Sequence, residues 1–160
     1  MTDKDTYISK THPAVILATW FWSGLSPKAP GTMGSLAALP FGYLLMQLGG
    51  QELLLGGIVV IFAVGLWATH IYISRTAKSD PGEVVIDEVA GQWIPLLIAG
   101  SNPLLYILAF ALFRLFDIWK PWPICWLDGH VKGAFGVMID DIVAGLFALV
   151  VLAFYMDNMA

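Results

Sequence analysis

The sequence predicts an all-α, polytopic integral membrane protein with about four or five short spans and an N-terminal interfacial helix. Three observations support this fold class. The 160 residues are 58% hydrophobic, and only 12% are charged, whereas a soluble domain carries about 25% charged residues. The mean hydropathy is +0.76. Two apolar stretches, residues 53–73 and 134–155, each approach the roughly 20 residues that a helix needs to cross a bilayer.

The first part of the chain is organised by short polar and proline-rich segments. Residues 1–13 are polar and form a predicted N-terminal tail, and residues 14–160 form one predicted membrane-embedded domain. Residues 14–22 are apolar but too short to span, which indicates an interfacial or buried helix. Two prolines and a glycine within residues 26–32 predict a loop, and residues 34–48 form the next short apolar span.

The second part of the chain alternates apolar arms with short connections. Residues 49–52 predict a tight turn, and residues 53–73 then cross back to a polar loop. Two shorter arms, residues 85–99 and 103–116, form a predicted hairpin. Each arm is about 20–24 Å long at 1.5 Å per residue, so the arms either cross the bilayer or re-enter on one side. A segment rich in Pro and Trp, residues 117–133, precedes the last span.

The basic residues all fall on one side of this topology, in the N-terminal region or after an even-numbered crossing. They are Lys4, Lys10, Lys28, Arg75, Lys78, Arg114, Lys120 and Lys132. The positive-inside rule therefore places the N-terminus in the cytoplasm and the C-terminus outside. The net charge of −4 argues against a nucleic-acid partner.

Carboxylates gather on the same side, although charge near hydrocarbon costs about 2.5–3.5 kcal/mol at the centre of a span. Asp87 and Glu88 lie side by side at the mouth of an apolar helix, and Gln92 follows Glu88 by one turn. Asp140 and Asp141 lie between apolar residues in the first turns of the last span. A divalent cation would offset their repulsion and desolvation, and Mg²⁺ prefers such oxygen ligands. The simpler alternative is that the acids only stabilise helix N-termini.

Two further segments carry groups suited to phosphate. Arg114 and Asp117 are three residues apart and can pair on one helix face, which Lys120 continues. A guanidinium in an otherwise apolar helix is well shaped to bind phosphate. Residues 30–35 begin a helix whose free backbone N–H groups suit an anion, although Thr32 also fits a simple N-cap.

Four segments of the chain together resemble the phosphatidylglycerophosphatase A family. They are residues 26–35, 84–92, 113–123 and 136–145, in the order of the family. One departure is that Ala134 follows Gly133 where a glycine pair is expected. The resemblance implies an all-helical, multi-pass protein of the bacterial inner membrane. It also implies a Mg²⁺-dependent phosphoric monoester hydrolase that converts phosphatidylglycerophosphate to phosphatidylglycerol and phosphate at the cytoplasmic leaflet.

For this reaction we predict a role for each group of candidate residues. The predicted catalytic residues are Asp87, Glu88, Asp117, Asp140, Asp141 and Arg114. The predicted Mg²⁺ ligands are Asp87, Glu88, Asp140 and Asp141. The predicted substrate-binding residues are Lys28, Thr32, Arg114 and Lys120. The ion would polarise the phosphoryl oxygens and activate water, and an aspartyl-phosphate intermediate stays open as an alternative.

Two other functions fit parts of the pattern. A CDP-alcohol-type membrane phosphotransferase also uses acids at helix ends, and Asp128 with Gly129 begins its motif, but residues 130–133 lack the Ala-Arg that should follow. A small divalent-cation transporter would need acids across the membrane midplane, whereas the acids here stop at one surface. The sequence leaves the oligomeric state open.

Overall fold

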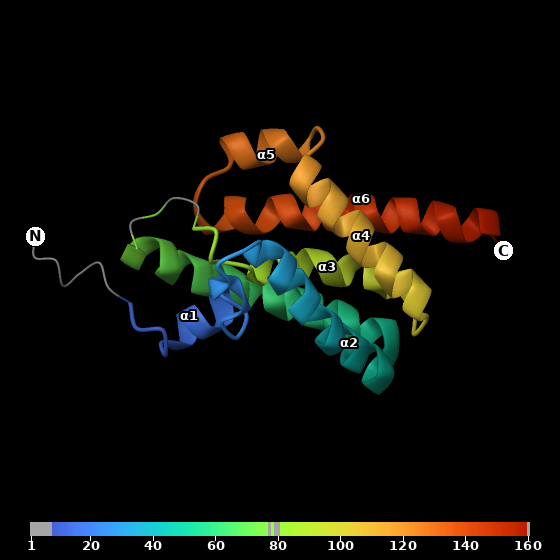
Figure 1. Ribbon diagram of the computed structural model, residues 1–160, viewed down its shortest axis with the longest axis horizontal. Coiled ribbons are helices and arrows are strands. Elements are labelled where there is room, and N and C mark those ends of the chain that lie inside the picture. The colour runs from blue at the N-terminus through green and yellow to red at the C-terminus, as the bar shows by residue number, and fades with distance from the viewer. Residues whose placement is uncertain (1–7, 77, 79–80, 160) are drawn as a thin grey trace, which may run out of the picture.

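The computed structural model describes residues 8–76, 78 and 81–159, and this part of the chain contains helices and no strand (Figure 1). The all-α prediction is therefore confirmed. The elements are α1 (Pro13–Ala18), the short 3₁₀ helix η2 (Ser23–Leu25), α2 (Pro30–Thr76), α3 (Ile86–Ala99), α4 (Pro103–Trp119), α5 (Ile124–His130) and α6 (Gly133–Met159). Residues 1–7 of the predicted polar tail, with Lys4, lie outside the described residues.

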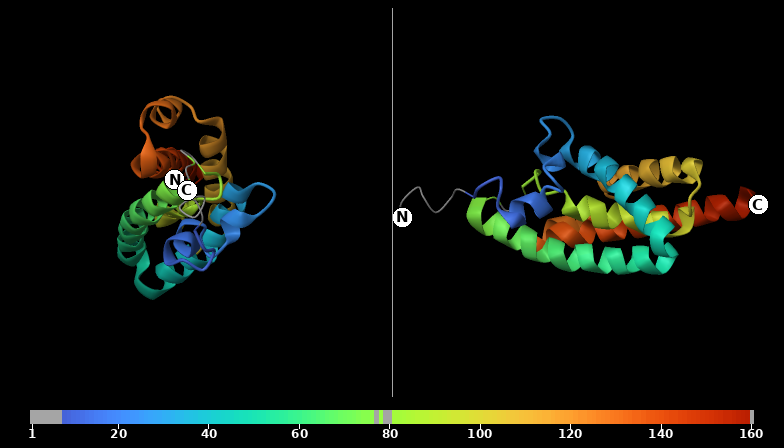
Figure 2. Two further views of the ribbon diagram at one scale, coloured as in Figure 1. Left: turned by 90° about the vertical axis from the view of Figure 1, so that its left-hand side faces the viewer. Right: turned by 90° about the horizontal axis from the view of Figure 1, so that it is seen from below.

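Helix α2 consists of two arms joined by a turn, as the sequence predicts at residues 49–52. Gly49 (φ −157°, ψ 19°) and Gly50 (φ 63°, ψ −155°) are not helical, and the positive φ of Gly50 favours glycine. Figure 2 shows the chain turning here and running back along the molecule. Near the turn, a Cβ added at Gly57 would lie 2.9 Å from the Leu45 side chain, so the two arms pack closely.

Two helical segments, Pro30–Thr76 and Gly133–Asn158, are long and apolar enough to cross a membrane. The exterior of the described chain also exposes large apolar side chains on several helices, such as Leu48, Ile107 and Phe154. Many large apolar side chains exposed in this way are expected where a protein contacts lipid. These features fit a membrane protein, and the number of spans stays a prediction.

Helix α3 occupies the centre of the structure, where it packs against α2, α4 and α6. Two glycines set its distance from α6. A Cβ added at Gly91 would meet the backbone of Asp141, and one added at Gly145 would meet the backbone of Gly91. On the opposite face, Trp93 Nε1 donates to the Ala38 carbonyl of α2 at 2.9 Å. The acids at the start of α3 are therefore fixed beside the first turns of α6.

The N-terminal helix is shorter than predicted. Residues 14–22 were expected to be one helix, but α1 ends at Ala18, and Trp20, Phe21 and Trp22 have positive φ values of 43°, 54° and 66°. This left-handed backbone cannot continue a right-handed helix, so α1 has only six residues.

Two other boundaries differ from the prediction. Residues 26–32 were expected to be a loop, but Pro30 begins α2, where its fixed φ and missing N–H suit a first helical position. The predicted surface segment 117–133 contains the short helix α5. The predicted hairpin of two arms about residues 100–102 is confirmed as α3 and α4.

Candidate active site

Three carboxylates from two helices meet at one point. Asp87 and Glu88 come from the first turn of α3, and Asp141 comes from α6. One oxygen from each residue lies within 4.8 Å of the others. The close contact of α3 and α6 at Gly91 brings the two segments together, although they are far apart in the sequence. This triad contains three of the four predicted Mg²⁺ ligands.

The triad is largely shielded from water. Asp87 is 8% exposed and Asp141 is 3% exposed, and Glu88 Oε2 is buried without a hydrogen-bond partner among the described residues. Charged carboxylates packed this closely repel one another and lose hydration. Mg²⁺ prefers hard oxygen ligands, and the triad offers carboxylate oxygens from two helices, of which Glu88 Oε2 has no hydrogen-bond partner among the described residues. The residues present therefore suit a divalent cation.

Asp140 is placed differently from its neighbour. Its Oδ2 lies 2.8 Å from Lys120 Nζ, and its Oδ1 accepts the backbone N–H of Asp141 at 3.1 Å. Lys120 Nζ also lies 2.8 Å from Asp128 Oδ1 on α5. The structure thus gives Asp140 a cationic partner, whereas the prediction gives it a metal ion.

The same contacts change the expected role of Lys120. Burial disfavours its charged form, but hydrogen bonds to Asp128 and Asp140 outweigh that effect and raise the pKa of the Lys120 ammonium above its usual range. Lys120 also ends α4 in a left-handed conformation (φ 45°). It therefore links the end of α4 to α5 and α6, in addition to lining the cavity described below.

Arg114 lies between its own helix and the start of α2. Its Nη1 lies 2.5 Å from Asp117 Oδ2, which confirms the predicted pair three residues apart. The same nitrogen donates to Ser35 Oγ at 3.3 Å, and Nε is buried without a hydrogen-bond partner among the described residues. Asp117 therefore orients a guanidinium that keeps donors available for a further ligand.

The first turn of α2 reaches the same place. A Cβ added at Gly31 would meet Glu88 Oε1 and lie 3.2 and 3.3 Å from Arg114 Nη1 and Nη2. Ser35 Oγ donates to the Gly31 carbonyl at 2.8 Å. Both residues lie in the segment 30–35 that is predicted to suit an anion, although neither is among the individually predicted site residues.

Gln92 lies one turn beyond Glu88 in the sequence but is not among the predicted site residues. It is fully buried, and neither amide atom has a hydrogen-bond partner among the described residues. It follows Glu88 by one turn, so the two side chains share a face of α3. Its spacing from Glu88 is visible in the sequence, whereas the burial of its unpaired amide appears only in the structure.

Two predicted substrate-binding residues stay at the edge of this arrangement. Lys28 is exposed in the segment before α2, and Thr32 is partly buried in the first turn of α2. Neither belongs to the described residues that line the cavity over the acids. Their substrate-binding role stays a prediction.

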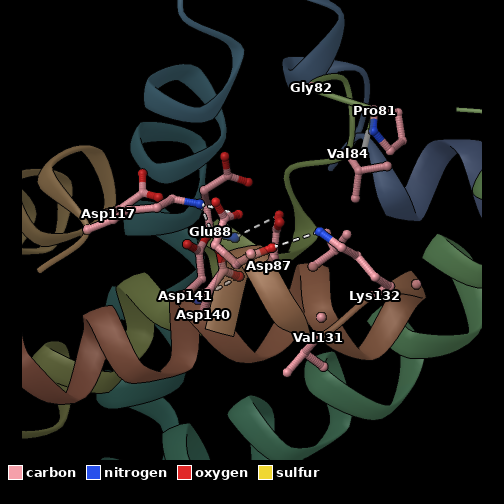
Figure 3. Close-up of a pocket in the computed structure, with 16 residues that line it drawn as sticks. Pro81, Gly82, Val84, Asp87, Glu88, Asp117, Val131, Lys132, Asp140 and Asp141 are labelled. Carbon is pink, nitrogen blue, oxygen red and sulfur yellow. Dashed lines mark hydrogen bonds and ion pairs between the residues drawn. The ribbon is translucent and has the colours of Figure 1, made fainter. Parts of the chain in front are cut away.

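A cavity of about 380 Å³ opens over the acids (Figure 3). The predicted carboxylates Asp87, Glu88, Asp117, Asp140 and Asp141 all line it. Lys132, which was not predicted, points toward them from the other side, and its Nζ donates to the Asp128 carbonyl at 3.3 Å. A cavity with acids at its base and lysines at its rim suits a phosphate ester held partly by a cation.

Comparisons with known proteins give a consistent assignment. Residues 16–156 match the family described as Phosphatidylglycerophosphatase A. A relative of that name from Escherichia coli (strain K12) is 43% identical over 150 residues, which cover 92% of this chain and 86% of the relative. A second relative of the same name, from Haemophilus influenzae, is 40% identical over 146 residues, which cover 91% of this chain and 90% of the relative.

One further relative carries a different name. A protein of Bacteroides thetaiotaomicron, provisionally named a phosphatidylinositol-3-phosphatase, is 40% identical over 153 residues, covering 87% of this chain and 91% of the relative. No solved structure matches the chain.

Proposed function

The chain belongs to the phosphatidylglycerophosphatase A family, and we propose that it hydrolyses phosphatidylglycerophosphate to phosphatidylglycerol and phosphate. The predicted family and the predicted class of enzyme, a phosphoric monoester hydrolase, are both confirmed at the level of the family. One structural observation supports hydrolysis of a phosphate ester most strongly. Segments from α2, α3, α4 and α6 converge so that Asp87, Glu88 and Asp141 lie near Arg114 and the first turn of α2.

Asp87, Glu88 and Asp141 would hold Mg²⁺, with Asp140 next to them in the same cavity. When bound, the ion would supply electrostatic stabilisation of the charge that develops on the phosphoryl oxygens. The unpaired, buried oxygen of Glu88 supports this proposal, because a buried carboxylate oxygen without a partner costs free energy.

The side chains around the acids would bind and orient the phosphate. Arg114, held by Asp117, would donate its remaining N–H groups to the phosphoryl oxygens. The first turn of α2 would add backbone N–H groups, and the absence of a side chain at Gly31 lets Glu88 and Arg114 lie against this turn. In the reaction, water adds to phosphorus, the bond from phosphorus to the glycerol oxygen breaks, and that oxygen takes up a proton. Lys132 at the cavity rim would hold the rest of the anionic headgroup.

The site would face the cytoplasmic leaflet of a bacterial inner membrane. The turn of α2 and the connection between α3 and α4 contain no basic residue, whereas the described basic residues lie in the other connections or near them. This asymmetry supports a cytoplasmic N-terminus and active site. Tryptophans such as Trp119 and Trp122 are exposed next to the site, as expected at the headgroup level.

Phosphate release from a panel of lipids tests this function. The purified protein is assayed with phosphatidylglycerophosphate, phosphatidylinositol 3-phosphate and phosphatidic acid, each with Mg²⁺ or with a chelator. We expect the first lipid to be cleaved with the highest kcat/KM and only when Mg²⁺ is present. A higher kcat/KM for the inositol lipid would show that the proposed substrate is wrong. Equal rates of phosphate release with Mg²⁺ and with the chelator would show that the reaction does not require Mg²⁺.

The rival functions give different products in the same preparation. A CDP-alcohol-type phosphotransferase would release cytidine monophosphate from a CDP-lipid and leave these phosphomonoesters intact. A divalent-cation transporter would carry metal into proteoliposomes without releasing phosphate.

A further inference from the structure

A second cavity, of about 340 Å³, lies away from the acids between the first arm of α2 and the beginning of α4. Almost all of its lining is apolar or aromatic. The lining residues are Leu39, Pro40, Tyr43, Ser101, Pro103, Tyr106 and Ile107. The rings of Tyr43 and Tyr106 meet edge to face across it, with centroids 5.9 Å apart. The cavity is therefore suited to a flexible hydrocarbon group rather than to a polar ligand.

Two polar contacts join the helices on either side of this cavity. At the end near the active site, Arg114 Nη1 of α4 donates to Ser35 Oγ of α2 at 3.3 Å. At the far end, Gln47 Nε2 donates to Ser101 Oγ at 2.6 Å. The apolar cavity, called the groove below, lies between these two contacts, with the Ser35–Arg114 contact on the side of the active site and the Gln47–Ser101 contact at the other end.

The depth of the groove matches the geometry of a lipid. Leu39 and Tyr43 lie four and eight residues beyond Ser35, which is about 6 and 12 Å along the helix. Ile107 lies seven residues before Arg114, or about 10 Å from it along α4. A lipid whose phosphate is bound beside Arg114 and the first turn of α2 would carry its acyl chains in this direction.

We propose that this groove binds one acyl chain of the lipid substrate, a proposal that rests on the phosphatase function above. The chain enters beside the Ser35–Arg114 contact and packs on the Tyr43–Tyr106 ring pair. The Gln47–Ser101 contact ends the groove, so methylene groups beyond it leave the protein surface. The groove thus contributes to binding of diacyl substrates and contributes nothing for the water-soluble headgroup.

Filling the groove tests the proposal. Ile107→Trp and Leu39→Trp add bulk where the acyl chain would lie. For phosphatidylglycerophosphate with long acyl chains, we expect kcat/KM to fall about tenfold, because several methylene groups lose their buried surface. For the deacylated headgroup, glycerophosphoglycerophosphate, and for a diacyl substrate with chains too short to reach Leu39, we expect kcat/KM to be unchanged.

Val150→Trp is the matched control. Val150 on α6 is 64% exposed and Ile107 is 65% exposed, but Val150 does not line the groove. We expect this variant to cleave all three substrates like the unaltered protein. Activity on the deacylated headgroup also shows that each variant is folded.

Several outcomes would overturn the proposal. An equal loss on the long-chain lipid and the deacylated headgroup would show a distorted active site, and no loss on either would show that the groove holds no substrate chain. Light scattering that shows a dimer in the unaltered protein and a monomer in Ile107→Trp, with lipid turnover retained, would assign the groove to a second copy. If the unaltered protein cleaved none of the substrates, the phosphatase function itself would fail instead.

Discussion

The two acidic pairs, Asp87–Glu88 in α3 and Asp140–Asp141 in α6, look alike in sequence but have different neighbours. Both members of the α3 pair join the carboxylate triad, whereas the α6 pair is divided. Asp141 joins the triad, and Asp140 pairs with Lys120. Adjacent residues on a helix point about 100° apart, so one pair can serve two neighbours when different elements pack on each side. The comparison shows that the packed surroundings, and not the pair itself, assign the role.

The largest expected effect separates the two members of the α6 pair. Asp141→Asn should lower kcat for phosphate release about 100- to 1000-fold, because the substitution removes the negative charge of one of the three carboxylates in the triad. Asp140→Asn should cost only about tenfold, because Asp140 acts through Lys120. The check is kcat for each purified variant at saturating Mg²⁺. Equal losses in both would remove the distinction between the two residues.

The second prediction concerns the space that the α3 pair requires. Gly31→Ala should lower kcat/KM about 100-fold, because its Cβ would meet Glu88 and displace it together with Arg114. Gly56→Ala in the same helix is the control, since a Cβ there would have nothing within 4 Å. Steady-state kinetics of the two variants give the comparison. Similar activity of both would show that the first turn of α2 is not held against the site.

A third prediction separates catalysis from stability beneath the α3 pair. Gln92→Leu should raise the melting temperature, because it removes two buried polar atoms without partners, each costing about 1–3 kcal/mol. The same change should lower kcat about tenfold, because leucine cannot replace the unpaired amide as a hydrogen-bond partner for a ligand held beside Glu88. Thermal unfolding and kinetics are measured on the same preparation. A more stable variant with normal kcat would make Gln92 a packing residue only.

The smallest effect concerns the lysine that pairs with Asp140. Lys120→Met should lower the free energy of unfolding modestly. The difference in this free energy between the variant and the unaltered protein should stay constant between pH 7 and 9. The folded pKa of Lys120 is raised, so its stabilisation is complete below the unfolded pKa of about 10.4 and is lost only as the pH rises through the folded pKa. Denaturant unfolding at several pH values checks this. A difference that declines already between pH 7 and 8 would contradict it.

Local features of the fold could be predicted from the sequence. The turn at Gly49 and Gly50, the α3–α4 hairpin and the Arg114–Asp117 pair depend on residues close together in the chain. Glycine, proline and helical spacing report directly on such features. The candidate acids could be found for a similar reason, since a charge in an apolar segment stands out in any single sequence.

Features that depend on packing between distant segments could not be predicted. The pairing of Asp140 with Lys120 requires the end of α4 to lie beside α6, and the approach of Gly31 to Glu88 requires α2 to meet α3. The left-handed backbone at Trp20 to Trp22 ends α1 early, although these residue types give no sign of it. Such positions are fixed by tertiary contacts that override local preference.

The contact of Gly91 with α6 has a mechanical consequence for the triad. With no side chain between the two backbones, α3 and α6 have no compressible layer that could absorb sliding of one helix along the other. A shift of one residue along the axis is about 1.5 Å, which is enough to move Asp141 out of register with Asp87. The geometry of the carboxylate triad therefore depends on a fixed register between α3 and α6.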